Sequence, residues 1–422
     1  MKFLLFSFLG VILGGSVLFL VHFVFEDEFL ELNLLINKYA DINKPQNVGL
    51  HKLALIAIQK ATFFLPSNDY VDFNRSDDQV GVGEYSRDFN GVLLYEKTVK
   101  NTKELIRAIN RSEPGTEIIV APGVYKLKGK KISMSSHGLL NSPIVLKAEQ
   151  MGDVIFEMYT QSGFNITGSF WRIENIIFKG VKGDKWVEHA IHLRGKVSNI
   201  HIINNQFINF NAHIKSNGKK KGKRKKKGIT YFPNNITIEH NNFFNEWKRN
   251  TKSPVTPIDV VGGNDWLIKN NFIADFGKNG RKGGGVTYGA FLKGGGENGV
   301  FDGNLVACEW KVKHTSKKDT RIGLSFGGGG TGKQFCSSKD CKTEFDQGIM
   351  RNNTIINCLN DVGVYINKSS NIQIFNNAIR NSLGVDVRYP TSNALIFNNL
   401  IEGRIKARDN AVIDQYDNFK KL

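Results

Sequence analysis

The chain has 422 residues, of which 41% are hydrophobic and 23% are charged. This length and composition allow one large or two ordinary domains with a real core, and they exclude a chain that is disordered throughout. The formal net charge is +18, and the tract Lys219–Lys227 (KKKGKRKKK) supplies eight of the positive charges. A basic surface favours an anionic partner, which could be nucleic acid, acidic phospholipid or an acidic polysaccharide.

The first 25 residues predict a transmembrane anchor and therefore export of the rest of the chain. Residues 3–25 are apolar apart from three polar positions, which is long enough to cross a bilayer as a helix. Lys2 precedes this segment and acidic residues 26–28 follow it, which places the N-terminus in the cytoplasm. We expect an uncleaved anchor in the inner membrane with the body facing the periplasm. A cleaved signal segment and a secreted body are the alternative.

Residues 26–90 predict a helical neck followed by a linker. Apolar residues recur at helical spacing within residues 28–39 and 49–65, and prolines bound both segments. Residues 67–90 are polar and predict a loop. The neck therefore separates the anchor from the body of the protein.

The body begins with a helix and a strand. The stretch Lys97–Gly129 (KTVKNTKELIRAINRSEPGTEIIVAPGVYKLKG) predicts a helix over Thr102–Asn110, a break near Pro114 and a strand over Glu117–Val120. This order resembles the N-terminal cap of right-handed parallel β-helix proteins, in which one helix covers the open end of the first coil.

An internal repeat predicts the architecture of the remaining chain. Each copy has apolar residues two apart, an asparagine pair and a second apolar pair, and copies near the C-terminus are 22–24 residues apart. Such a period is typical of one β-solenoid coil, and stacked coils bury a continuous core. We predict an all-β fold, a single-stranded right-handed parallel β-helix over residues 91–410, and a C-terminal tail at 411–422. The copies are FWRIENIIFKG, IHIINNQFINF, ITIEHNNFFNEW, DWLIKNNFIADF, GVFDGNLVACEW, GIMRNNTIINC, IQIFNNAIRNS and ALIFNNLIEGR.

Stacked asparagines can bond their amides along the solenoid axis, so we interpret most of them as structural. Insertions between the repeats predict the working face, because long loops of solenoids gather on the binding side. They fall at residues 215–230, 248–257, 277–285, 310–320 and 333–344.

Three successive coils between residues 257 and 332 pair an apolar strand with glycines: PIDVVGGNDW, YGAFLKGGGENG and RIGLSFGGGGTG. Glycine removes the side chain where a ligand or another backbone comes close, so these coils predict the floor of a groove. Lys293 ends the apolar run of the central coil. A phosphate-binding loop is disfavoured, because GGGGTG lacks the Gly-Lys-Ser/Thr ending.

The cap, the Asn-Asn coils and the strand that ends in Lys293, followed by a short link to an asparagine, resemble the chondroitinase B and alginate lyase family over residues 92–404. In that family, a lysine so placed abstracts the proton next to the sugar carboxylate. An arginine one coil later assists, and an acidic cluster just upstream holds calcium. The resemblance therefore implies a catalytic Lys293 and leaves calcium possible.

This chain departs from the family pattern at two places. Val286, Thr287 and Tyr288 stand where the family carries glutamates. The segment 325–327 (Ser-Phe-Gly) stands where the family carries Arg-His-Gly, so Arg321 at the start of the same strand is the candidate replacement.

β-Elimination on a uronate needs a base and positive charge near the carboxylate. A neighbouring Arg321 would lower the pKa of Lys293 and make its neutral amine available. We therefore predict Lys293 as the base, Tyr288 as the acid, and Arg321 with Arg388 as carboxylate clamps.

The predicted substrate-binding residues come from four parts of the chain. Asp386 and Arg388 are two apart on a strand and so share a face. Asp259 precedes a glycine pair, and with Asp361 it is the alternative acid–base pair of a hydrolase. The remaining candidates are Lys219, Lys220 and Lys221, which begin the basic tract and would steer an anionic polymer.

The cysteines and histidines are not spaced as in a zinc-binding motif. Cys336 and Cys341 close a short loop and could form a disulfide in an oxidising compartment or remain free thiols. His189 and His192 flank an apolar strand without a third ligand at a standard spacing, which indicates packed or exposed histidines.

The sequence thus predicts a monomeric, membrane-anchored lyase that acts on an acidic, uronate-containing polysaccharide, with no nucleic-acid partner. Three alternatives stay open: a uronate epimerase, a hydrolase that uses Asp259 and Asp361, and a non-catalytic module that binds acidic glycans. The expected partners are the polysaccharide and the membrane.

Overall fold

The computed structural model describes residues 80–83, 91–129, 131–181, 187–220, 230–279, 285–328, 330–337 and 340–421. Backbone contacts divide the chain into residues 1–77 and 78–422, and all described residues belong to the second unit. The expected anchor and the helical part of the neck lie outside the described residues. Within the described ranges, no helix is long and apolar enough to cross a membrane.

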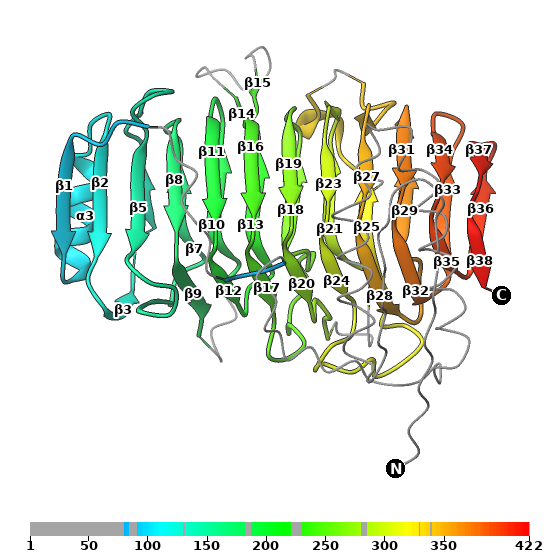
Figure 1. The fold of residues 1–422 in the computed structure, drawn as a ribbon, viewed down its shortest axis with the longest axis horizontal. Coiled ribbons are helices and arrows are strands. Elements are labelled where there is room, and N and C mark those ends of the chain that lie inside the picture. The colour runs from blue at the N-terminus through cyan, green and yellow to red at the C-terminus, as the bar shows by residue number, and fades with distance from the viewer. Residues whose placement is uncertain are drawn as a thin grey trace, which may run out of the picture. The chain divides into compact units, whose positions relative to one another are not determined.

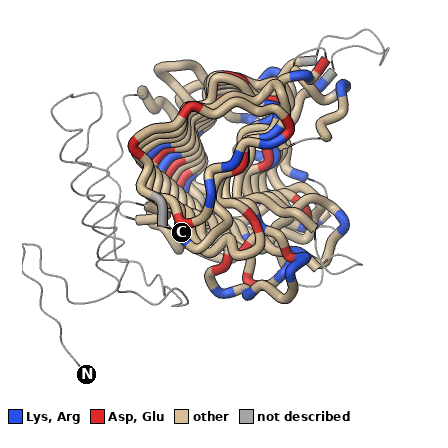
Figure 2. The backbone as a smooth tube through the Cα atoms, turned by 90° about the vertical axis from the view of Figure 1, so that its right-hand side faces the viewer, with Lys and Arg blue, Asp and Glu red and all other residues tan. Residues whose placement is uncertain are grey.

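The described chain is a parallel β-helix, in which each coil contributes one strand to each of three long sheets (Figure 1). Viewed along the stack, successive coils superimpose and outline the same cross-section (Figure 2). Neighbouring strands of the three sheets pair in parallel throughout. The fold predicted from the repeat, an all-β parallel solenoid, is therefore confirmed.

The strands of the three sheets follow one another along the chain in the order A, B, C. Sheet A contains β1 (Tyr95–Val99), β2 (Thr116–Val120), β5 (Ile144–Ala148), β8 (Trp171–Glu174), β11 (Ser198–Ile203), β16 (Asn234–Glu239), β19 (Trp266–Lys269), β23 (Val300–Asp302), β27 (Ile349–Arg351), β31 (Ile372–Phe375), β34 (Asn393–Phe397) and β37 (Val412–Tyr416). Sheet B contains β3 (Gly123–Leu127), β6 (Val154–Met158), β9 (Ile176–Gly180), β12 (Gln206–Ile208), β17 (Asn242–Phe244), β20 (Phe272–Ala274), β24 (Leu305–Ala307), β28 (Thr354–Cys358), β32 (Ala378–Ser382), β35 (Leu400–Glu402) and β38 (Phe419–Lys421). Sheet C contains β4 (Ile132–Met134), β7 (Ser162–Ile166), β10 (His189–Arg194), β13 (Ala212–Asn217), β18 (Ile258–Val261), β21 (Thr287–Lys293), β25 (Arg321–Phe326), β29 (Val364–Asn367), β33 (Gly384–Arg388) and β36 (Arg404–Arg408).

Shorter elements decorate the coils. They are the antiparallel pair β14 (Lys219–Lys220) and β15 (Thr230–Tyr231), the small sheet of β22 (Gly296–Glu297), β26 (Phe345–Asp346) and β30 (Ser369–Ser370), and the 3-10 helix η2 (Lys333–Phe335). The parallel ladders extend through β37 and β38, so the last coil includes residues that the sequence analysis places in a C-terminal tail.

One helix, α3 (Thr102–Asn110), covers the first coil, as predicted. Its N-terminus is capped by Asn101, whose side chain accepts a hydrogen bond from the Glu104 backbone N–H. The Glu104 carboxylate in turn accepts a hydrogen bond from the backbone N–H of Lys100 at 2.8 Å. Leu105 and Ile109 are fully buried on the face that meets the first coil. The helix thereby covers apolar side chains that the first coil would otherwise expose.

A ladder of buried asparagines runs along the bend between sheets A and B. The Asn271 side-chain amide and backbone N–H both donate to Asn304 Oδ1 at 3.0 Å, and Asn304 donates in turn to Asn353 Oδ1. This repeated contact satisfies polar groups that would otherwise be unpaired in the core. The members are Asn205, Asn241, Asn271, Asn304, Asn353, Asn377 and Asn399.

The two asparagines of the repeat have different tasks. The first of each pair, such as Asn376 (φ 56°), adopts the left-handed backbone conformation that asparagine tolerates better than most residues. The second, such as Asn377, belongs to the buried ladder. The predicted structural role of the repeated asparagines is therefore confirmed, and each position of the pair has its own reason.

Two disulfides are present. Cys336 is bonded to Cys341, which resolves the alternative that the sequence left open. Cys308 is bonded to Cys358, a pair that the sequence analysis missed. The partners are 50 residues apart in the chain, and only the pairing of β24 with β28 brings them together.

Candidate active site on the outer face of sheet C

Most of the predicted site residues lie on neighbouring strands of sheet C. Ile258, Ala290 and Leu324 are in register across β18, β21 and β25, and all three point into the core. Because strand side chains alternate, the next residue of each strand lies on the outer face. The resulting outer row is Lys215, Asp259, Phe291, Ser325, Tyr365 and Asp386.

This outer row is largely covered. Asp259 is 4% exposed and Ser325 is 0% exposed, although both lie outside the core. Tyr288 packs against Ile322, Val362 and Tyr365 in a small apolar cluster. The outer face of sheet C is therefore a strip in which only some of the side chains reach solvent.

Lys293 lies at the end of β21 in a mostly buried position. Its Nζ is 4.3 Å from the centroid of the Phe291 ring, which is a cation–π contact when the amine is charged. Burial lowers the pKa of Lys293. Asp259 and Glu344 oppose this shift, and the positive charge of Lys215 adds to it. Lys293 therefore loses its proton at a lower pH than an exposed lysine does.

The prediction that Arg321 supplies the like charge beside Lys293 is wrong. Arg321 pairs with Thr287, at the opposite end of β21 from Lys293. The cation that lowers the pKa of Lys293 is Lys215, two strands away on β13.

Lys215 and Asp259 form an ion pair across β13 and β18, with Nζ and Oδ1 2.7 Å apart. The Lys215 side chain is 21% exposed, so part of it remains accessible to solvent. Lys215 was expected at the start of an insertion, whereas it lies on the outer face of β13 in sheet C. The alternation of AHIKSN is the signal that could have found it.

Glu344 is a second site residue that the sequence analysis missed. It is 2% exposed, and its carboxylate accepts hydrogen bonds from the backbone N–H groups of Gly328 and Thr331 and from the Thr331 hydroxyl. Glu344 therefore holds the glycine segment after β25 next to Lys293. It follows the cysteine loop and belongs to no repeat, so the sequence carries no signal for it.

The glycines serve mainly to bring coils together. A Cβ on Gly296 would lie 2.2 Å from the Gly263 carbonyl oxygen, and one on Gly294 would lie 2.8 Å from the Gly262 nitrogen. Gly328 differs, because a Cβ there would lie 3.1 Å from Lys293 Cδ. The predicted groove floor is thus a set of close backbone contacts, and Gly328 leaves the space that the Lys293 side chain occupies.

Tyr288 and Lys293 contact the same aromatic ring. The Tyr288 ring meets Phe291 edge to face, with centroids 5.4 Å apart, and Lys293 Nζ lies over that ring. Burial raises the pKa of the Tyr288 hydroxyl, so the group is protonated at neutral pH. A proton donor and a proton acceptor therefore flank one side chain.

Arg321 occupies a structural position. It is 0% exposed, and its Nη1 donates to the carbonyl oxygens of Cys308 and Val312 at 2.7 and 2.8 Å. Its Nε and Nη2 donate to Asp319, which also pairs with Lys248. A guanidinium with this set of partners cannot clamp a substrate carboxylate. It instead fixes the insertion at residues 310–320 to the start of β25.

Asp386 and Arg388 share the outer face of β33, as predicted, but each has its own partner. Asp386 accepts hydrogen bonds from Arg408, with Nε and Oδ1 2.9 Å apart. Arg388 Nε donates to Asp409 Oδ2 at 2.5 Å, and its guanidinium lies over the Tyr389 ring. The Arg388 side chain is 33% exposed and remains accessible.

Asp361 lies in the turn before β29, and its carboxylate accepts a bond from the Val362 backbone N–H at 2.9 Å. Burial raises its pKa, and the nearby Asp386 adds to the shift. The charge of Asp361 also raises the pKa of the Tyr288 hydroxyl, whereas the charge of Asp259 raises the pKa of Lys293. The two carboxylates of the hydrolase alternative thus contact different parts of the strip.

The basic tract begins as a hairpin. Lys219 and Lys220 form β14, which continues from β13, the strand that carries Lys215. Lys221 lies outside the described residues. The tract therefore leaves the solenoid at the coil that supplies one of the cations of the strip.

His189 and His192 lie on β10, beside Lys215 in the register. The His192 ring shares a 2.6 Å hydrogen bond with Asn217 Oδ1, and burial lowers its pKa to about 4. His192 is therefore neutral at pH 7. Within the described part of the chain, no group of three His, Cys, Asp or Glu side chains is placed to hold a metal ion.

The family model described as Chondroitinase B matches residues 99–293, slightly less than half of the chain. The chain is distantly similar to the chondroitinase B family. The match ends at Lys293 and does not reach Arg321. No curated protein sequence matches the chain.

Solved structures of three carbohydrate-active enzymes illustrate the similarity in fold. An alginate lyase from Paenibacillus sp. str. FPU-7 has 13% identity and a TM-score of 0.41, over 77% of this chain and 95% of that one. A mannuronic acid-specific family 6 lyase from human gut microbiota has 17% identity and a TM-score of 0.41, over 78% and 83%. A lacto-N-biosidase from Eubacterium ramulus has 12% identity and a TM-score of 0.46, over 78% and 68%.

Proposed function

We propose that this chain is an exported polysaccharide lyase that cleaves an acidic, uronate-containing polymer by β-elimination. The observation that carries the proposal is a mostly buried lysine, Lys293, which lies over the Phe291 ring with a lowered pKa, at the end of a sheet C strand where the matched family model also ends. The match to the family of chondroitinase B supports the choice of an acidic polysaccharide as substrate.

In the proposed reaction, the neutral Nζ of Lys293 takes the proton from the ring carbon next to the uronate carboxylate. The electron pair of that carbon–hydrogen bond forms a double bond to the adjacent ring carbon, whose bond to the glycosidic oxygen breaks. The protonated hydroxyl of Tyr288 donates its proton to the leaving oxygen. Water then returns a proton to Tyr288 and removes the one on Lys293.

Positive charge near the carboxylate stabilises the enolate-like intermediate. We assign this task to Lys215 in place of Arg321, because the Lys215 side chain is partly exposed and Arg321 is fully buried. Arg388, Asp386, Asp361 and Asp259 line the strip, where Arg388 would contact a neighbouring uronate of the same polymer.

The family resemblance raises the question of calcium. Thr287 and Tyr288, upstream of Lys293, offer no carboxylate, and calcium prefers several carboxylate and carbonyl oxygens. The residues present do not fit the calcium site of the family. The proposed reaction therefore contains no step through calcium.

Export belongs to the proposal as well. The apolar residues 1–25 would hold the protein in the inner membrane with the solenoid in the periplasm, or would be removed on secretion. The two disulfides support an oxidising compartment, since such bonds are rare in the cytosol.

The test is incubation with alginate, pectate and chondroitin, followed by ultraviolet absorbance of unsaturated uronate products. We expect absorbance to rise with at least one polymer for the wild type and for Lys126→Ala, an exposed control on β3. We expect Lys293→Ala to lose it by about a hundredfold or more, as for removal of a catalytic base.

Other outcomes would select the alternatives. Exchange of the ring proton with solvent without cleavage indicates an epimerase. Cleavage without unsaturated products indicates a hydrolase. Binding that weakens with salt, without any product, indicates a glycan-binding module and overturns the enzyme proposal.

A further inference from the structure

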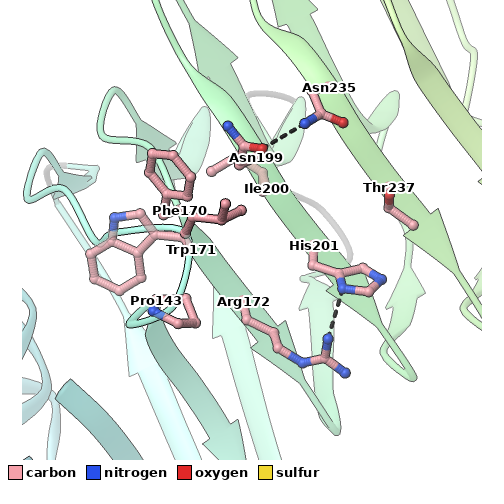
Figure 3. A pocket seen from close by; sticks show the side chains of 10 residues that line it. Pro143, Phe170, Trp171, Arg172, Asn199, Ile200, His201, Asn235 and Thr237 are labelled. Atoms are coloured by element: carbon pink, nitrogen blue, oxygen red, sulfur yellow. Dashed lines mark hydrogen bonds between the residues drawn. The ribbon is translucent and has the colours of Figure 1, made fainter. Parts of the chain in front are cut away.

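A separate recess lies on the outer face of sheet A, near the N-terminal end of the stack. Its volume is about 250 Å³, and it spans β8, β11 and β16. Arg172, His201 and Thr237 form a row across these strands, as Figure 3 shows. The lining residues are Leu140, Pro143, Phe170, Trp171, Arg172, Asn199, Ile200, His201, Asn235 and Thr237.

One side of the recess is apolar and the other is polar. Pro143 and Phe170 lie on the side toward β5 and β8, and Leu140, another lining residue, is 74% exposed. Asn199 and Asn235 lie on the polar side, joined by a bond from Asn235 Nδ2 to Asn199 Oδ1. A ligand that fills this space needs an apolar face and a hydrogen-bonding edge.

The charge in the recess is already balanced. Arg172 is the permanently charged residue of the lining set, and it forms an ion pair with Glu174. Its Nη1 also contacts His201 Nδ1 at 2.7 Å, and His201 Nε2 contacts Glu239 at 2.7 Å. This chain of contacts holds the guanidinium in place, so an anion would have to compete with Glu174. The recess therefore favours an uncharged ligand.

Two polar groups are available to such a ligand. Within the described residues, the Thr237 hydroxyl and Asn235 Oδ1 have no hydrogen-bond partner. A hydroxyl and an amide oxygen can together bond two adjacent hydroxyl groups of a ligand. The recess is smaller than typical pockets for drug-sized molecules, which begin at about 300 Å³.

We propose that the recess is a second saccharide-binding site, which takes one uncharged pyranose ring. A pyranose combines an apolar ring face, which fits against Phe170 and Pro143, with hydroxyl edges that fit Thr237 and Asn235. The site lies on sheet A, whereas the candidate active site lies on sheet C, so this proposal does not rest on the lyase proposal.

The test measures binding of methyl glycosides of glucose, galactose, mannose and N-acetylglucosamine, with methyl glucuronide as the charged counterpart. Ligand-observed NMR and calorimetry give the dissociation constants. We expect at least one neutral glycoside to bind the wild type with a dissociation constant of about 1 mM, as for a small open site. Added sodium chloride should leave this binding unchanged, because no unpaired charge is involved.

The variant Thr237→Trp fills the recess and should weaken binding about tenfold or more, which corresponds to about 1.4 kcal/mol. Its matched control is Gln373→Trp, in the same outer row of sheet A on β31 but outside the recess. The control should bind as the wild type does, and both variants should unfold at the wild-type temperature. Absence of binding by every neutral glycoside, equal affinity in Thr237→Trp, or salt-sensitive binding of the glucuronide alone would overturn the proposal.

Discussion

At the scale of single residues, the protonation of Lys293 makes the reaction rate depend on pH. The charges of its neighbours set the pH at which the rate rises. The amine must be neutral to accept a proton, so the rate should rise with pH up to the lowered pKa of Lys293. Lys215→Gln removes a like charge and should move this rise to higher pH. Asp259→Asn removes an opposite charge and should move it to lower pH.

Profiles of kcat/KM against pH for the wild type and the two variants test this prediction. Opposite shifts indicate a group near both side chains, which describes Lys293 and His189, and a rise that persists in His189→Ala identifies Lys293 as the titrating group. Shifts in the same direction would contradict its assignment as the base.

We predict that Arg321 stabilises the fold and takes no part in the reaction. Its removal leaves Asp319 and several carbonyl groups short of partners in a buried position. We expect Arg321→Ala to lower the free energy of unfolding by about 3–5 kcal/mol, as for a broken buried ion pair. The exposed Arg404→Ala should change it by less than about 0.5 kcal/mol. Denaturant unfolding measures both, and loss of kcat in a stable Arg321→Ala protein would return Arg321 to the active site.

At the scale of elements, the asparagine ladder joins each coil to the next. Asn304→Ala removes the acceptor of two Asn271 N–H groups and the donor to Asn353. We expect a loss of about 2–3 kcal/mol in the free energy of unfolding, because buried groups are left unpaired. The exposed Asn298→Gly, at a bend with φ 57°, is the control and should be nearly neutral. Equal effects of the two changes would contradict the special role of the ladder.

The sequence could predict the elements but only part of the candidate site, for a physical reason. Helix α3 and the strand ending in Lys293 follow from local signals: a cap, a period and a glycine turn. Lys215 and Glu344 reach the site only through stacking of coils, and loops that vary in length set that register. Arg321 was placed on the correct strand, but the sequence could not show that the strand begins beneath an insertion.

At the scale of the whole molecule, the net charge of +18 should attract an anionic polymer before it reaches the strip on sheet C. Replacing residues 219–227 by a glycine–serine segment removes eight positive charges. We expect kcat/KM on the polymer to fall several-fold at low salt, kcat to stay unchanged, and the difference to vanish at high salt. Steady-state kinetics at two salt concentrations measure this effect. A loss of kcat at both concentrations would instead place the tract in the catalytic machinery.

The segment Val80–Gly83 has a mechanical consequence. Val80 is buried, and the segment crosses the coils on one side of the stack in Figure 1. Its backbone bonds reach three different coils, at Asn270, Asn242 and Asn204. Tension applied through the preceding chain would therefore be shared among several hydrogen bonds loaded together, instead of peeling one strand from an end. Such a junction would let the solenoid resist force applied through the chain that precedes it.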